Sequence, residues 1–220
     1  MERIAHVKAV VFDMDGTILD TLEDLRSSVN HALREHGMPE RSSMEIRSFL
    51  GSGMVYLIHR AVPEGTDAET EASVLASHKA YYPLHCAEQT SPYPGIADLL
   101  RVIRDAGIKT AVVSNKSDEN VQALVRDYFD GLFTVAVGAR EGVPRKPSPE
   151  LVEIALTELD VSKEEAVYIG DSDVDVATAK ASGLSMITVL WGFRDKTELI
   201  AAGAECFADN TKELARMLGL

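Results

Sequence analysis

The chain has 220 residues, of which 45% are hydrophobic and 26% charged, which is typical of a globular protein that buries one large core or a core with a modest insert. Its formal net charge of −13 repels the phosphates of nucleic acids and of anionic lipids, so we expect neither as a partner. No apolar run reaches the roughly 18 residues that a membrane-spanning helix needs.

Neither the start of the sequence nor its cysteines indicate secretion. Residues 1–6 include Glu2 and Arg3 and lack a long apolar run, so we expect no secretory signal. The two cysteines, Cys86 and Cys206, lie far apart and do not suggest a disulfide framework or a zinc site. We therefore expect a cytoplasmic protein.

Five short apolar runs are continuous rather than alternating, as in strands buried on both faces of a parallel sheet, and a sixth, weaker run follows. Amphipathic helical segments separate most of them, among them residues 96–105, with Gly107 past the end, and residues 149–159, with Ser148 as N-cap. This alternation predicts an α/β fold with a doubly wound, Rossmann-like parallel sheet. The predicted strands are residues 7–12, 110–114, 133–137, 166–170, 185–190 and 206–208.

One stretch breaks the alternation, because no strand pattern occurs between residues 22 and 82. Thr21 can cap a helix that ends at Gly37, and three further helical patterns follow at residues 44–50, 54–61 and 67–82. Proline and glycine in residues 90–95 mark the return of the chain. We expect an all-helical domain with hinges at residues 17–92, inserted into an α/β core formed by residues 1–16 and 93–220.

Polar residues follow the first two major strands, at the sheet edge where open α/β sheets bind ligands. Asp13 and Asp15 follow the first strand, and both carboxylates face one site only if the chain turns at Gly16. A simple turn is the alternative. Ser114 and Asn115 follow the second strand, where a hydroxyl and backbone amides suit a phosphate oxygen or merely cap the next helix.

Lys146 is a candidate for the positive charge that an anionic substrate needs on so acidic a protein. It precedes Pro147 and a capped helix, which fixes its place in the chain. The alternative is a solvated surface lysine.

Three carboxylates follow the fourth strand, at Asp171, Asp173 and Asp175, and such crowding is costly unless the carboxylates meet a cation. The spacing is that of a calcium loop, but Val176 and Ser182 stand where that loop needs glycine and glutamate. Magnesium, which takes few protein ligands and keeps its waters, fits better.

Taken together, these residues resemble the four motifs of the haloacid dehalogenase superfamily of phosphohydrolases, in order and across essentially the whole chain. The helical insert is similar to the cap domain of that superfamily. The matching residues are Asp13-x-Asp15-Gly16-Thr17, Ser114, Lys146 and Gly170-Asp171…Asp175.

The resemblance implies a role for each residue. Asp13 would be the nucleophile that forms an aspartyl-phosphate, and Asp15 the general acid and base. Phosphate would be bound by Ser114, Asn115 and Lys146. The Mg²⁺ ligands would be the Asp13 carboxylate, the Asp15 carbonyl oxygen and Asp171. Asp175 would bind the metal through water or orient its ligands, and Asp173 would be structural.

Residues 47–53 are similar to the cap loop of the phosphoglycolate phosphatase branch, and so is Trp191-Gly192-Phe193-Arg194 after the fifth strand. Arg47 could pair with a substrate carboxylate, and Gly51 and Gly53 would let the backbone approach it. A plain helix–helix turn is the alternative.

The resemblance therefore implies a Mg²⁺-dependent phosphatase acting on a small phosphorylated metabolite, with 2-phosphoglycolate as the first choice. Pyrophosphate or sugar-phosphate hydrolysis, a phosphomutase, and a non-catalytic protein that binds a phosphate ligand are the alternatives. We expect a monomer or a homodimer.

Overall fold

The computed structural model describes residues 7–220 and divides the chain into two compact units. One unit runs to Leu19 and resumes at Pro92, and the other is Asp20–Ser91. Residues 1–6, in which we expect no secretory signal, lie outside the described part of the chain. No helix within residues 7–220 is both long enough and apolar enough to cross a membrane.

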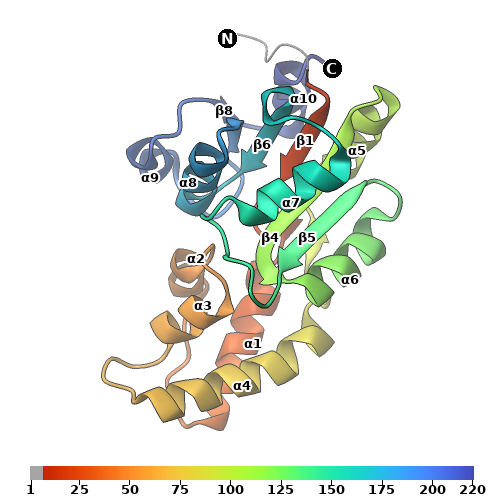
Figure 1. Ribbon diagram of the computed structural model, residues 1–220. Coiled ribbons are helices and arrows are strands. Elements are labelled where there is room, and N and C mark those ends of the chain that lie inside the picture. Colours follow the sequence, from red (N-terminus) through yellow and green to blue (C-terminus); the bar gives the residue numbers. More distant parts are fainter. Residues whose placement is uncertain (1–6) are drawn as a thin grey trace. The chain divides into compact units, whose positions relative to one another are not determined.

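The first unit is built on a parallel sheet, as the alternation of strands and helices predicted. In the described residues six strands pair in the order β5-β4-β1-β6-β7-β8, with helices packed against them (Figure 1). β1 therefore lies between β4 and β6, which correspond to the second and fourth predicted strands. This parallel arrangement confirms the predicted fold class. The strands are β1 (Ala9–Phe12), β4 (Lys109–Ser117), β5 (Val135–Ala139), β6 (Ala166–Gly170), β7 (Ser185–Val189) and β8 (Phe207–Ala208).

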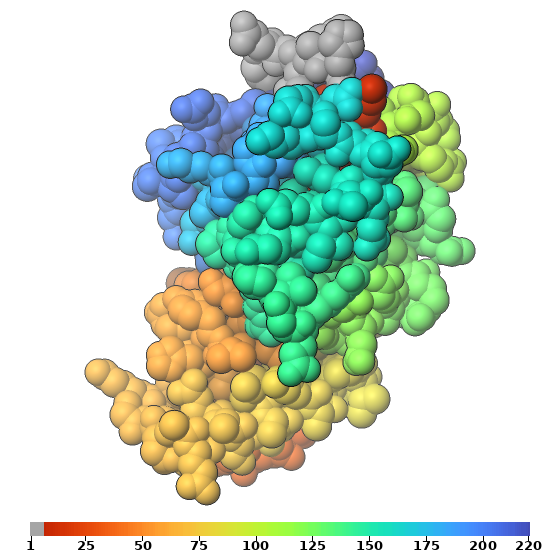
Figure 2. Space-filling view, viewed as in Figure 1, coloured from red at the N-terminus to blue at the C-terminus, as the bar shows by residue number. Residues whose placement is uncertain are grey.

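The continuous apolar strands arise because helices cover both faces of the sheet. All four residues of β1 are buried. Alternate strand residues, such as Val11 and Val113, pack with Leu151 and Ala155 of α7 in one core cluster. Helix α7 packs against β4 and β5, and in the space-filling view the teal segment of the chain that includes α7 lies on the surface facing the viewer (Figure 2). The helices of this unit are α5 (Ile96–Asp105), α6 (Asp118–Phe129), α7 (Glu150–Leu159), α8 (Asp173–Ser182), α9 (Lys196–Ala202) and α10 (Thr211–Met217).

Local signals placed most helix ends correctly. Helix α5 spans the predicted residues, and Gly107 follows it at φ 74°, in the left-handed region that closes a helix. The predicted N-cap of α7 is wrong by one residue, because Pro149 occupies that position. Ser148 belongs to the preceding turn, where its backbone N–H donates to the carbonyl oxygen of Arg145.

The second unit, Asp20–Ser91, consists mainly of helices between Leu22 and His85, and Asp24 of its first helix binds the last residues of the unit. The carboxylate of Asp24 is buried and accepts the backbone N–H groups of Gln89 and Thr90 at 2.8–3.0 Å. The two segments that connect the units pair as the short strands β2 (Leu19–Asp20) and β3 (Ser91–Pro92). The helices are α1 (Leu22–Glu35), α2 (Ser43–Phe49), α3 (Met54–Ala61) and α4 (Ala68–His85).

Candidate active site

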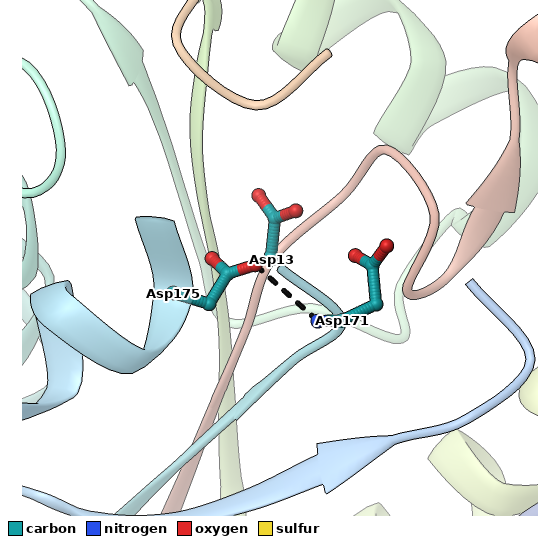
Figure 3. Close-up of side chains that lie close together, drawn as sticks. All are labelled: Asp13, Asp171 and Asp175. Carbon is teal, nitrogen blue, oxygen red and sulfur yellow. Dashed lines mark hydrogen bonds between the residues drawn. The ribbon is translucent and has the colours of Figure 1, made fainter. Parts of the chain in front are cut away.

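Two aspartates lie next to each other because the strands that carry them are neighbours. Asp13 directly follows β1 and Asp171 directly follows β6, and the two strands pair in parallel. The backbone N–H of Asp13 donates to the carbonyl oxygen of Ile169 at 2.8 Å, which extends this pairing to the nucleophile candidate. Figure 3 shows both carboxylates pointing the same way, with Asp175 of α8 beside them. Ligand oxygens of the three lie within 4.8 Å of one another.

The turn after Asp13 requires glycine for two separate reasons. Gly16 adopts φ 88°, which side chains of L-residues rarely tolerate. A Cβ atom there would also lie 2.3 Å from Oδ2 of Asp171. The turn is closed by a hydrogen bond from the Gly16 backbone N–H to the carbonyl oxygen of Leu19 at 2.9 Å. The predicted turn at Gly16 is thus present and brings the chain against Asp171.

Lys146 is buried and its ammonium group makes three contacts in the site. Its Nζ lies 2.6 Å from Oδ1 of Asp13 and 2.9 Å from Oδ1 of Asp175. It also donates to the hydroxyl of Tyr168 at 2.9 Å. The surface-lysine alternative is excluded by the 5% exposure of this residue.

Asp175 holds other groups in place with both of its oxygens. Oδ1 accepts from Lys146 and from the hydroxyl of Tyr168, each at 2.9 Å. Oδ2 accepts the hydroxyl of Ser172 at 2.6 Å and the backbone N–H groups of Ser172 and Asp171 at 3.1 and 3.3 Å. Asp175 therefore ties the start of α8 to the end of β6 and to Lys146.

Asp171 is clamped from both sides. Its Oδ1 accepts the Thr17 hydroxyl at 2.8 Å, and its Oδ2 accepts the Phe193 backbone N–H at 2.7 Å. Gly192 lies so close that a Cβ atom would be 2.3 Å from the Cβ and from Oδ2 of Asp171. The indole N–H of Trp191 donates to the carbonyl oxygen of Thr17 at 3.0 Å, so this aromatic residue also supports the clamp.

Burial and mutual repulsion change the proton affinities of these groups. Burial, followed by the charge of Asp175, raises the pKa of Asp171 to about 7. The same two causes raise the pKa of Asp13 well above its ordinary value. Burial alone would raise the pKa of Asp175 too, but the Lys146 charge and the Ser172 hydrogen bonds outweigh it and lower that pKa. Of these three carboxylates, Asp13 and Asp171 therefore bind a proton more readily than Asp175 does.

Burial alone would lower the pKa of Lys146, yet that pKa is raised well above its usual value because the carboxylates of Asp13 and Asp175 stabilise the ammonium form. Lys146 is therefore a permanent cation in the site.

The charges and donor atoms fit a divalent metal ion. Asp15 lies near enough to raise the pKa of Asp13 by its charge, and its Oδ1 is 3.1 Å from Nζ of Lys116. The site therefore contains more carboxylates than lysines. The carboxylates are those of Asp13, Asp15, Asp171 and Asp175, and the lysines are Lys116 and Lys146. A divalent cation offsets negative charge that the two lysines leave uncompensated, and carboxylate oxygens are the ligands that hard cations prefer.

Ser114, the residue that matches the second motif, lies within β4, because this strand is longer than predicted. β4 continues to Ser117, past its predicted end, with an irregular register between Val113 and Ser117. Ser114 is buried, and its Oγ accepts the backbone N–H of Lys116 at 3.2 Å. The Asn115 side chain donates to the carbonyl oxygen of Lys146 at 2.9 Å. Asn115 therefore fixes the segment that presents the lysine.

The three predicted cap residues belong to the second unit. Arg47 lies in the last turn of α2, and Gly51 and Gly53 have φ angles of 111° and 85° in the turn before α3. Tyr168, Lys116 and Phe193 had no role assigned to them from the sequence. The available signals were a tyrosine in the otherwise aliphatic β6 and a lysine directly after Ser114 and Asn115.

The family follows from a comparison of the whole chain with known proteins. The family model described as haloacid dehalogenase-like hydrolase matches residues 10–189. The chain belongs to the haloacid dehalogenase-like hydrolase family. This confirms the resemblance inferred from the four motifs.

Individual relatives cover nearly the whole chain. A phosphoglycolate phosphatase of Chromobacterium violaceum is 32% identical over 96% of each chain. The crystal structure of a putative phosphoglycolate phosphatase from Lactobacillus delbrueckii is 37% identical, with a TM-score of 0.93, covering 97% of this chain and 98% of that one. A variant of CbbY from Rhodobacter sphaeroides, solved in complex with xylulose-(1,5)bisphosphate, is 30% identical with a TM-score of 0.75, covering 94% and 96%.

Proposed function

We propose that this hydrolase is a Mg²⁺-dependent phosphatase that cleaves a small phosphate monoester through an aspartyl-phosphate on Asp13. One observation carries the proposal: the buried ammonium of Lys146 lies 2.6 Å from Oδ1 of Asp13, beside the clamped carboxylate of Asp171. A nucleophilic carboxylate next to a fixed cation suits attack on a dianionic phosphoryl group, where catalysis is mostly positioning and charge neutralisation.

The first step transfers the phosphoryl group to the protein. An oxygen of Asp13 attacks phosphorus and forms a P–O bond while the bond to the leaving oxygen breaks. Asp15 gives its proton to that oxygen, so the leaving group departs with a hydroxyl group rather than as an alkoxide. Lys146, Ser114 and Asn115 hold the phosphoryl group or the backbone around it during transfer.

The second step regenerates the enzyme. Asp15, now a carboxylate, takes a proton from a water molecule that attacks the same phosphorus atom. The bond between phosphorus and Asp13 breaks, and inorganic phosphate is the product. Asp15 ends the cycle protonated and Asp13 ends it ionised, which restores the starting state.

The Asp13 carboxylate, the Asp15 carbonyl oxygen and Asp171 would hold Mg²⁺, which supplies positive charge to the phosphoryl oxygens when bound. In this proposal Asp175 orients neighbouring groups of the site and does not coordinate the metal ion. Both of its oxygens already accept hydrogen bonds, from Lys146, Tyr168 and Ser172. The excess negative charge of the described site supports the assignment of a divalent ion.

The substrate we propose is 2-phosphoglycolate. The name that the Chromobacterium violaceum relative carries supports it. Arg47, Gly51 and Gly53 are the proposed specificity residues of the helical unit. We further propose that the protein works in the cytoplasm, as a monomer or homodimer, since Cys86 and Cys206 lie far apart in the sequence and do not suggest a disulfide framework.

Phosphate release from 2-phosphoglycolate, sugar phosphates and pyrophosphate tests the proposal. We expect release with Mg²⁺, none with excess chelator, and the highest kcat/KM for 2-phosphoglycolate. Release that persists in chelator contradicts the metal assignment. No release from any ester by folded protein favours the non-catalytic phosphate-binding alternative.

A sugar-phosphate phosphatase or phosphomutase is the second candidate. The CbbY variant with bound xylulose-(1,5)bisphosphate, at 30% identity over nearly the whole chain, supports it. A higher kcat/KM for a sugar phosphate than for 2-phosphoglycolate would favour this candidate.

A further inference from the structure

A second buried lysine lies in the site, and the mechanism above gives it no task. Lys116 sits near the end of β4 with only 4% of its side chain exposed. Its Nζ lies 3.1 Å from Oδ1 of Asp15, whose side chain is 21% exposed. Burying an ammonium group is costly, so its position next to a more accessible carboxylate calls for an explanation.

The two lysines face different carboxylates. Lys146 contacts the nucleophile Asp13, where the phosphoryl group must arrive. Lys116 contacts Asp15, which gives its proton to the leaving oxygen in the proposed first step. A general acid must lie within hydrogen-bond reach of the oxygen that it protonates. Lys116 is therefore on the side of the site where the leaving half of the substrate lies.

A cation in that place discriminates between leaving groups. An ester of a neutral alcohol presents no charged group for the ammonium group to bind, and at most a neutral hydroxyl oxygen. An ester of a hydroxy acid presents a carboxylate a few bonds from the leaving oxygen, and a charge-assisted hydrogen bond to it is stronger than a neutral one. The protein's net charge of −13 repels such a polyanionic ester, so a local cation has a large effect on its binding.

We infer that Lys116 binds a carboxylate on the leaving half of the substrate and so selects phosphate esters of small hydroxy acids over esters of neutral alcohols. The inference deepens the proposed function and rests on it, because it takes the leaving group to lie at Asp15.

The test compares two esters of the same size, 2-phosphoglycolate and 2-hydroxyethyl phosphate, which differ in that a hydroxymethyl group replaces the carboxylate. We expect wild-type protein to prefer 2-phosphoglycolate in kcat/KM. Lys116→Gln should lower kcat/KM for 2-phosphoglycolate by roughly 10- to 100-fold, mainly through KM, and change the neutral ester much less. Lys116→Arg, which keeps the charge, should retain most of the preference.

Lys109→Gln is the matched control, because Lys109 lies at the opposite end of the same strand, where its ammonium donates to the carbonyl oxygen of Leu159. This variant should keep the wild-type ratio of the two esters.

Three results would count against the inference. Equal losses for both esters in Lys116→Gln would mean that Lys116 only positions Asp15. Equal kcat/KM for both esters in wild-type protein would overturn the inference without any variant, even if Lys116→Gln did not fold. Hydrolysis of neither ester would overturn 2-phosphoglycolate as the proposed substrate, and the inference with it.

Discussion

The ammonium nitrogen of Lys146 lies 2.6 Å from Oδ1 of Asp13, although 133 residues separate them in the sequence. The same ammonium binds Asp175, so one buried cation joins residues that follow β1, precede α7 and begin α8. An ion pair this deeply buried constrains geometry more than it stabilises the fold. Its position at the nucleophile candidate gives the first prediction.

Asp13→Asn should abolish turnover while the fold persists. The amide is almost the same size as the carboxylate but is a poor nucleophile, so we expect kcat to fall by roughly 10³-fold or more. Single-turnover phosphate release measures the loss. Asp173→Asn is the control, because this carboxylate is half-exposed and pairs with Arg194. A similar loss in the control would contradict the assignment of Asp13.

Tyr168→Phe should destabilise the protein by about 1–2 kcal/mol, because it removes a buried hydroxyl that Lys146 and Asp175 both contact at 2.9 Å. Urea unfolding gives the free energy. Tyr81→Phe, in the helical unit, is the comparison, since that ring stacks between His31 and His85 and should tolerate the change. An unchanged stability of Tyr168→Phe would show that the network does not depend on this hydroxyl.

Gly192→Ala should weaken Mg²⁺ binding by roughly tenfold or more, because the new methyl group would collide with Asp171 at 2.3 Å and displace it. Overpacking should also cost about 1–3 kcal/mol of stability. Calorimetric titration with Mg²⁺ and chemical unfolding measure the two effects.

The control is Gly131→Ala, where φ is 69° and the new methyl group meets no atom within 4 Å. It should cost about 1–2 kcal/mol through backbone strain and leave Mg²⁺ affinity unchanged. Equal Mg²⁺ affinities for Gly192→Ala and wild-type protein would remove Gly192 from the clamp on Asp171.

The pKa of about 7 at Asp171 predicts a pH dependence without metal. Because this pKa is raised from 3.8, proton binding at Asp171 favours the folded state. That stabilisation is complete below about pH 4 and is lost as pH rises towards 7. The raised pKa of Asp13 acts in the same direction. In chelator, the stability of wild-type protein relative to Asp171→Asn should therefore fall between pH 4 and 7.

Metal binding should show the opposite trend. A carboxylate must lose its proton before it coordinates, so the apparent Mg²⁺ affinity should rise as pH increases towards about 7, by up to roughly tenfold per unit for one proton released. Titrations at pH 5.5, 6.5 and 7.5 would measure it. An affinity independent of pH over this range would show that Asp171 is already ionised.

The sequence alone determined the architecture of the core and its family. Continuous apolar runs predicted the strands because helices bury both faces of the sheet, and the residues at the strand ends marked the site because parallel strands end at one edge. Glycines at helix ends, such as Gly107, were read correctly because a left-handed residue is a local requirement. The Ser148 N-cap was wrong because the competing turn from Arg145 is also local and was not recognised.

Only the tertiary structure decided which polar groups meet. Tyr168 joins the site because the turn from β6 into α8 places Asp175 beside it, and Lys116 joins because β4 pairs with β1, the strand before Asp15. Nothing within β6 or β4 taken alone specifies those partners. The clamp on Asp171 has the same origin, since Thr17 and Phe193 reach it from segments 154 and 22 residues away in the sequence. Proton affinities likewise depend on burial and on charges brought together by folding, and neither can be read from residue spacing.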